Sequence, residues 1–157
     1  MIQLVITSLI TFISTNIDDF AVLLLLFAHS DNIKTAIKIT LGQVIGITLL
    51  TIFSLLAASG CAMLPHKYIR LLGFIPIILA IIYIIQNKKT NENTPSSDIH
   101  VNTSKYIFIS TLILTLSDGG DNIGVYIPVF TYAKNYESIV IFGLFILFSL
   151  LWCFAAY

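Results

Sequence analysis

Charged residues are scarce in this sequence, and so are cysteines. Only 10% of the 157 residues are charged, whereas soluble domains carry about 25%. The formal net charge is zero, which argues against a nucleic-acid partner, because such proteins present a basic surface. Cys61 and Cys153 are too few and too far apart for a disulfide framework or a zinc knuckle. No basic stretch precedes the first apolar run, so we expect no cleavable signal peptide.

Apolar residues, in contrast, are abundant and occur in long runs. They make up 57% of the chain, and the mean hydropathy is +0.96. We therefore predict an all-α, polytopic helical membrane protein whose first partner is the lipid bilayer. A helix needs roughly 20 apolar residues to cross a bilayer. On this measure the five expected spans are residues 2–28, 36–58, 68–85, 105–132 and 138–157.

The chain divides into two hydrophobic units around a polar segment. We predict that residues 1–85 form a first unit of three spans and residues 105–157 a second unit of two. Residues 86–104 are polar and low in complexity, which is typical of a solvated linker without a fold of its own. Basic residues are more numerous on the linker side, so the positive-inside rule places the linker in the cytoplasm.

Two carboxylates and two glycines interrupt the fourth expected span. Asp118 and Asp121 flank Gly119 and Gly120 near its middle. An ionised Asp at that depth costs about 2.5–3.5 kcal/mol, and a glycine costs up to about 1 kcal/mol relative to alanine in a helix. We therefore predict a break or kink here, and a functional site.

The first expected span carries a similar motif. The apolar run after Asp18 and Asp19 is too short to span a bilayer, so these acids also fall mid-segment. One register aligns the two motifs, with Ser14 on Ser117, Asp18 on Asp121, Asp19 on Asn122 and Val22 on Val125. Three spans lie between the two copies, which therefore point opposite ways, as in an inverted-topology repeat. A complete 3+3 repeat would need a sixth span after Tyr157, which we count as missing.

Packing of the two halves through these motifs would bring their polar side chains together. We expect Asp18 to share a helix face with Thr15, and Asp121 to share one with Asp118. Carboxylates in a low dielectric need a cation or protons, so we predict a divalent cation exchanged for protons. The expected pathway residues are Asn16, Asp18, Asp19, Asp118, Asp121 and Asn122, with Thr15, Gln43, Cys61 and Cys153 as further candidates.

The second expected span contains a packing motif. Gly42 and Gly46 have the small-xxx-small spacing that lets two helices approach closely. Gln43 either lines the path or bonds a neighbouring backbone, and both interpretations stay open. A free buried cysteine is more often a small hydrophobe than a ligand. Trp152 is of a type enriched in interfacial aromatic belts.

Several motifs resemble those of the bacterial cadmium-resistance transporter family, which belongs to the lysine-exporter superfamily. They are TFISTNIDD at residues 11–19, GQ at 42–43, LLGFIPI at 71–77, GGDNIGVYIP at 119–128 and WC at 152–153. The resemblance implies an efflux protein of the bacterial plasma membrane that confers resistance to Cd2+, with the ion as substrate and no cofactor. The family's acidic motifs map onto Asn16, Asp18 and Asp19, and onto Asp118, Asp121 and Asn122.

Ligand chemistry alone does not select cadmium. Oxygen ligands favour hard ions such as Ca2+, Mn2+ or Mg2+, whereas Cd2+ prefers thiolate; a transporter must also release its ion, for which moderate affinity serves well. Export of a quaternary ammonium or an amino acid on the same scaffold is an alternative, and self-association into a homo-oligomer stays open. An intramembrane aspartyl protease fits poorly, because Asp118 replaces the first glycine of the Gly-x-Gly-Asp pattern, so we expect no enzyme.

Overall fold

The computed structural model describes residues 2–30, 32–61 and 106–157. Within these ranges the regular structure is entirely helical. The helices are α1 (Ile2–Thr15), α2 (Ile17–Ala28), α3 (Ile33–Cys61), α6 (Ile107–Asp118), α7 (Gly120–Tyr132) and α8 (Asn135–Ala156). The expected third span at residues 68–85 and the linker at 86–104 lie outside the described residues.

The described helices have the length and composition of membrane spans. Both α3 and α8 are long and apolar enough to cross a bilayer, and α1 with α2 would make a third crossing if the bent pair is one span. Many large apolar side chains face outward, as lipid contact requires. They include Ile2, Leu25, Phe53, Ile139 and Phe154. The predicted class of all-α polytopic membrane protein is confirmed.

Two of the expected spans are each divided into a pair of short helices. The fourth is interrupted at Gly119, between α6 and α7, which confirms the break predicted at the glycine pair. The first is interrupted at Asn16, where α2 turns away from α1 by 62°. This second break was not predicted. At 12 residues, α6 is too short to cross a bilayer alone.

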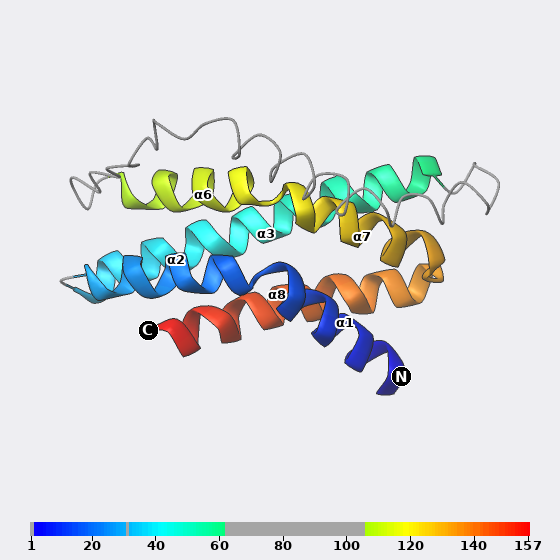
Figure 1. Ribbon diagram of the computed structural model, residues 1–157, viewed down its shortest axis with the longest axis horizontal. Helices are drawn as coiled ribbons and strands as arrows, with labels where there is room; N and C mark the ends of the chain where they lie inside the picture. The colour runs from blue at the N-terminus through cyan, green and yellow to red at the C-terminus, as the bar shows by residue number, and fades with distance from the viewer. Residues whose placement is uncertain (1, 31, 62–105) are drawn as a thin grey trace, which may run out of the picture.

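The two broken pairs run in opposite directions along the length of the molecule (Figure 1). From the N-terminus, α1 and α2 lead toward one end of the molecule, and α3 returns to the other. The pair α6 and α7 then repeats the direction of α3, and α8 returns toward the C-terminus. Helix α3 packs against α6, α7 and α8, and α8 also packs against α1 and α2.

Glycines bring α3 close to α6. A Cβ atom on Gly46 would lie 2.7 Å from Thr115 Cγ2, and one on Gly42 would lie 2.8 Å from the carbonyl oxygen of Phe108. Such distances are below van der Waals contact, so only glycine fits at either position. The close approach predicted from the small-xxx-small spacing is confirmed, with α6 as the partner helix.

Two apolar clusters fill the interior, one at each side of the helix breaks. The first joins α1, α3, α7 and α8 around Phe12, Tyr126 and Phe145. The second joins α2, α3, α6 and α8 around Leu23 and Ile39. Trp152 of α8 packs against both clusters.

Candidate functional site

The break between α1 and α2 is held by the side chain of Asn16. Its amide Nδ2, which has two protons to donate, lies within hydrogen-bond distance of three acceptors: the carbonyl oxygen of Phe12 at 2.9 Å, Thr15 Oγ1 at 2.9 Å and the hydroxyl of Tyr126 at 3.0 Å. The backbone carbonyl oxygen of Asn16 accepts from Trp152 Nε1 at 2.8 Å and from the backbone N–H of Phe20 at 3.1 Å. Asn16 is fully buried, so these bonds satisfy polar groups that water cannot reach.

The second broken pair reaches this break through Asn122. Its Nδ2 points at Asn16 Oδ1 across 3.5 Å, a long and weak contact. The Asn122 backbone N–H donates to Asp121 Oδ1 at 2.8 Å. Among the described residues nothing donates to Asn122 Oδ1, although the side chain is only 1% exposed. A buried carbonyl oxygen without a donor is available to a ligand.

Asp19 lies inside the bundle, one turn beyond the first break. Gln43 Nε2 of α3 donates to Asp19 Oδ2 at 2.8 Å, and Gln43 Oε1 accepts from Thr115 Oγ1 of α6 at 2.5 Å. All three side chains are buried. The question left open for Gln43 is therefore answered in part, because its amide bonds two side chains rather than a neighbouring backbone.

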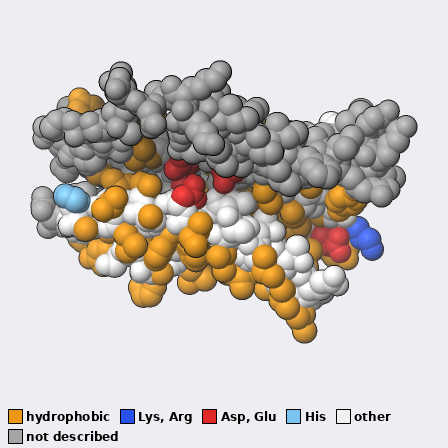
Figure 2. All heavy atoms as spheres, in the orientation of Figure 1, with side chains coloured by type: hydrophobic (Ala, Val, Ile, Leu, Met, Phe, Trp, Pro, Cys, Tyr) orange, Lys and Arg blue, Asp and Glu red, His pale blue; other side chains and the backbone are white. Residues whose placement is uncertain are grey.

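The four membrane acids share one electrostatic neighbourhood. The carboxyl groups of Asp18, Asp19, Asp118 and Asp121 are close enough for each to feel the charge of the other three. Asp18 and Asp118 are exposed and Asp121 is half-buried, and acidic side chains gather midway along the molecule in Figure 2. In the described part of the chain, however, no three Asp, Glu, His or Cys side chains are close enough to hold a metal ion together.

The expected pairing of acids on helix faces needs two corrections. Thr15 and Asp19 are both buried, whereas Asp18 is exposed. The expected pairing of Thr15 with Asp18 relied on one continuous helix, which the break at Asn16 interrupts. Asp118 ends α6 and Asp121 lies in the first turn of α7, so their i,i+3 spacing does not describe one helix either.

The register found in the sequence also aligns the structure. It places the break at Asn16 on the break at Gly119, and it pairs the buried Asp19 with the buried Asn122. Further pairs that are buried in both copies are Ser8 and Thr111, Phe12 and Thr115, Leu23 and Tyr126, and Phe27 and Phe130. This register was the signal that could have located the unpredicted break.

The remaining candidates lie away from the breaks or beyond description. Cys153 is buried in the second apolar cluster. Cys61 ends α3, and its side chain is not among those described. Sequence reasoning gave Tyr126 no place among the site residues and left an interfacial role for Trp152 open, whereas both contact Asn16 inside the bundle.

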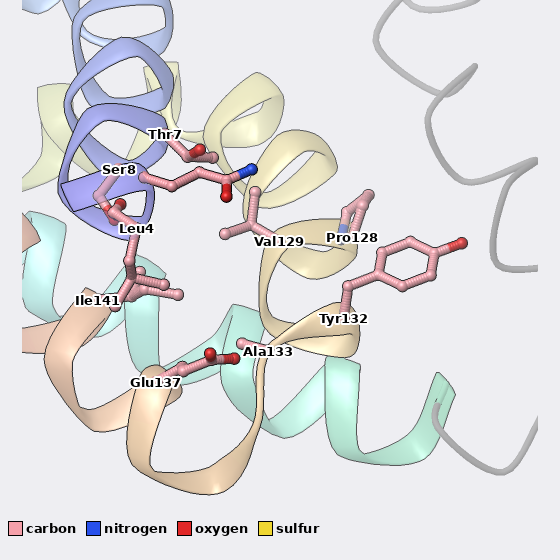
Figure 3. Close-up of a pocket in the computed structure, with 10 residues that line it drawn as sticks. Leu4, Thr7, Ser8, Pro128, Val129, Tyr132, Ala133, Glu137 and Ile141 are labelled. Carbon is pink, nitrogen blue, oxygen red and sulfur yellow. The ribbon is translucent and has the colours of Figure 1, made fainter. Parts of the chain in front are cut away.

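A separate cleft opens at the N-terminal end of α1, away from the four acids of the spans (Figure 3). Its volume is about 520 Å³. Residues of three helices line it: Gln3, Leu4, Thr7 and Ser8 of α1, Pro128, Val129 and Tyr132 of α7, and Glu137 and Ile141 of α8, with Ala133. Glu137 caps its own helix, accepting from the Lys134 backbone N–H at 2.8 Å.

Comparison with known families gives a match over residues 12–157, under the description cadmium resistance transporter. The match includes both helix breaks and all four membrane acids. The chain belongs to the cadmium resistance transporter family. The suspected family is thus confirmed. No match was found among curated proteins, and none among solved structures. As a member of this family the chain is a membrane transport protein; its individual pathway residues stay predictions.

Proposed function

We propose that this cadmium resistance transporter exports Cd2+ across the bacterial plasma membrane in exchange for protons. The observation that carries the proposal is the meeting of the two interrupted spans, where Asn122 of α7 contacts Asn16 between α1 and α2. Interrupted helices at the interface of two repeats form the ion sites of many transporters, because the break frees backbone carbonyls and positions side chains.

Charge balance supports a divalent cation as the substrate. Asp19 is buried and accepts a hydrogen bond from the Gln43 amide, and three more carboxylates lie within electrostatic range. Such a group of negative charges is costly in a low dielectric unless a cation or protons neutralise it. Exchange of a divalent ion for protons keeps the carboxylates neutralised in both halves of a transport cycle.

The ligand set supports release as much as binding. No ready-made cluster of three charged ligands occurs among the residues that the structure describes. One or two carboxylates at a time would hold Cd2+ with moderate affinity, together with an amide oxygen such as Asn122 Oδ1, which accepts no hydrogen bond from the described residues. Oxygen ligands bind this soft ion less tightly than thiolates do, so the ion can leave again.

The antiparallel course of the two broken pairs supports a route to both sides of the membrane. Helices α1 and α2 run in the opposite direction to α6 and α7 (Figure 1). The helix breaks and the buried positions of the two pairs align in one sequence register. We infer an inverted-topology repeat whose two copies expose the shared site alternately. From the charge pattern of the sequence we infer that the linker at residues 86–104 faces the cytoplasm.

Ion uptake into inverted membrane vesicles tests the proposal. Vesicles from cells that express the chain should accumulate Cd2+ when their interior is acidic, and a protonophore should abolish the accumulation. Asp121→Asn should lower uptake about tenfold or more, equivalent to ~1.4 kcal/mol of lost ion binding. Glu137→Gln removes an acid outside the proposed pathway and should leave uptake unchanged.

Each arm of this experiment can contradict a different part of the proposal. Accumulation that survives the protonophore would refute proton exchange. Equal uptake by Asp121→Asn and the unaltered chain would remove the carboxylate pathway. Transport of Mn2+, Zn2+ or Ca2+ in preference to Cd2+ would refute the substrate, and transport of none of them would favour another solute.

A further inference from the structure

We propose that Thr115 and Gln43 are positioning residues that fix the orientation of the Asp19 carboxylate toward the transported ion. This inference rests on the proposed function and extends it to a residue, Thr115, that carries no charge and lies outside the acidic motifs. Three helices contribute one residue each to the arrangement, with Asp19 on α2, Gln43 on α3 and Thr115 on α6. All three side chains are buried.

The direction of each hydrogen bond follows from the chemistry of the groups. An amide oxygen has no proton, so the contact of 2.5 Å between Thr115 Oγ1 and Gln43 Oε1 requires the hydroxyl to donate. With its oxygen held there, the Gln43 amide must present its NH2 group to Asp19 Oδ2, at 2.8 Å. The hydroxyl of Thr115 thus holds the oxygen end of the amide while the NH2 end meets Asp19.

Without the hydroxyl, Gln43 Oε1 would lose this donor inside the bundle, where water does not replace it. The Gln43 side chain would then be held less firmly against the Asp19 carboxylate. The observed orientation gives the carboxylate a charge-assisted hydrogen bond on one oxygen and leaves Oδ1 without a partner from Gln43. Residues that orient a metal-binding side chain in this way commonly change metal affinity by 10–100-fold when altered.

The position of Thr115 is itself fixed by the packing of α3 on α6. Gly46 faces the Thr115 side chain so closely that a Cβ there would lie 2.8 Å from the Thr115 Cβ. Gln43 lies three residues before Gly46, on the same side of α3. Gly42 and Gly46 therefore bring α6 near enough to α3 for the Thr115 hydroxyl to reach the Gln43 amide.

One turn away, Thr111 provides a matched control. It is buried against Gly42 much as Thr115 is against Gly46. Each hydroxyl faces a carbonyl oxygen of its own helix, that of Ile107 at 2.8 Å from Thr111 and that of Thr111 at 3.0 Å from Thr115, but only Thr115 also reaches Gln43. Thr111→Val and Thr115→Val make the same chemical change at equivalent packing positions. Only the second removes a contact to Gln43.

Cd2+ uptake kinetics in inverted vesicles, with the amount of transporter measured in each preparation, test the proposal. Gln43→Leu should raise KM for Cd2+ by about tenfold. Thr115→Val should raise KM by about fivefold or more with a smaller change in maximal rate, and Thr115→Ser, which keeps the hydroxyl, should restore KM. Thr111→Val should leave KM unchanged.

The double variant decides whether Thr115 acts through Gln43. If it does, Thr115→Val has no further effect on KM in the Gln43→Leu background. Multiplication of the two effects, or an equal shift in Thr111→Val, would overturn the positioning role and leave a packing role only. An unaltered chain that transports no Cd2+ would instead contradict the proposed function.

Discussion

The indole N–H of Trp152 donates to the backbone carbonyl oxygen of Asn16, at 2.8 Å, from a helix 136 residues away in sequence. The ring lies between the two helices that meet at this break. It makes an edge contact with Phe12 of α1 and a tilted contact with Phe20 of α2, with ring centroids 5.9 and 5.0 Å apart respectively. Trp152 therefore holds both the bend of α1 against α2 and the carbonyl group at its centre.

Trp152→Phe should separate the hydrogen bond from the ring packing. Phenylalanine keeps an aromatic ring between Phe12 and Phe20, and the Asn16 carbonyl oxygen keeps its bond from the Phe20 N–H at 3.1 Å. The expected loss is about 1 kcal/mol, whereas Trp152→Ala should cost about 3–5 kcal/mol because it also opens a cavity. Thermal unfolding in detergent measures both.

Phe154→Leu provides the control for these two variants, because Phe154 on the same helix is 79% exposed and should tolerate the change. If Trp152→Phe proved as damaging as Trp152→Ala, the carbonyl bond rather than the ring would hold the break. An unfolding temperature unchanged in both variants would mean that Trp152 does not hold it.

The fold class followed from the sequence, because it rests on a pattern that the membrane enforces, whereas the place of the site at the acids stays a prediction. A span of roughly 20 apolar residues has few alternatives, and acids within it are too costly to be incidental. The glycine pair likewise indicated the break at Gly119. The structure gives a reason for glycine at this position other than backbone freedom, however. Gly119 has an ordinary φ of −73°, and a Cβ there would overlap the side chain of Leu50.

The break at Asn16 could not be predicted from local sequence. Asn16 is followed by apolar and acidic residues that continue a helix readily, and no proline or glycine is nearby. Its amide ends the helix by bonding Phe12 and Thr15 behind it and Tyr126 on α7. The last partner lies 110 residues away, and local sequence does not show such a contact.

Gly46→Ala tests the packing of α3 against α6. The added methyl group would lie 2.7 Å from Thr115 Cγ2, so the two helices must move apart, at an expected cost of about 1–3 kcal/mol. Gly143→Ala on α8 is the control, because nothing lies within 4 Å of a Cβ at that position. It should stabilise the protein by about 0.5–1 kcal/mol through the better helix propensity of alanine.

Both glycine variants are compared by thermal unfolding in the same detergent, with Cd2+ uptake as a second measurement. Gly46→Ala should also reduce uptake, since displacement of α6 carries Thr115 away from Gln43. Opposite signs of the two stability changes are the expected result. A stabilising effect of Gly46→Ala would show that the helices can separate at no cost.

Asp18→Asn and Asp19→Asn should have unequal effects, although the two acids are adjacent. Asn at position 19 can still accept from Gln43 Nε2 through its amide oxygen, so the fold should survive while the buried charge is lost. We expect Cd2+ uptake to fall at least about tenfold, because a low-dielectric site magnifies the loss of one charge. Asp18 is exposed, and loss of its charge should raise KM only about two- to fourfold, because it weakens the long-range electrostatic attraction of Cd2+.

Ionic strength distinguishes the two roles. Exposed charges are screened over about 8–10 Å at physiological salt, so the defect of Asp18→Asn should shrink as salt rises from 0.01 to about 0.3 M. The defect of Asp19→Asn should persist at every salt concentration, since a buried charge is screened much less. Uptake rates measured across this range, at fixed free Cd2+, make the comparison. A larger and salt-independent loss in Asp18→Asn would mean that Asp18, and not Asp19, turns inward to hold the ion during transport.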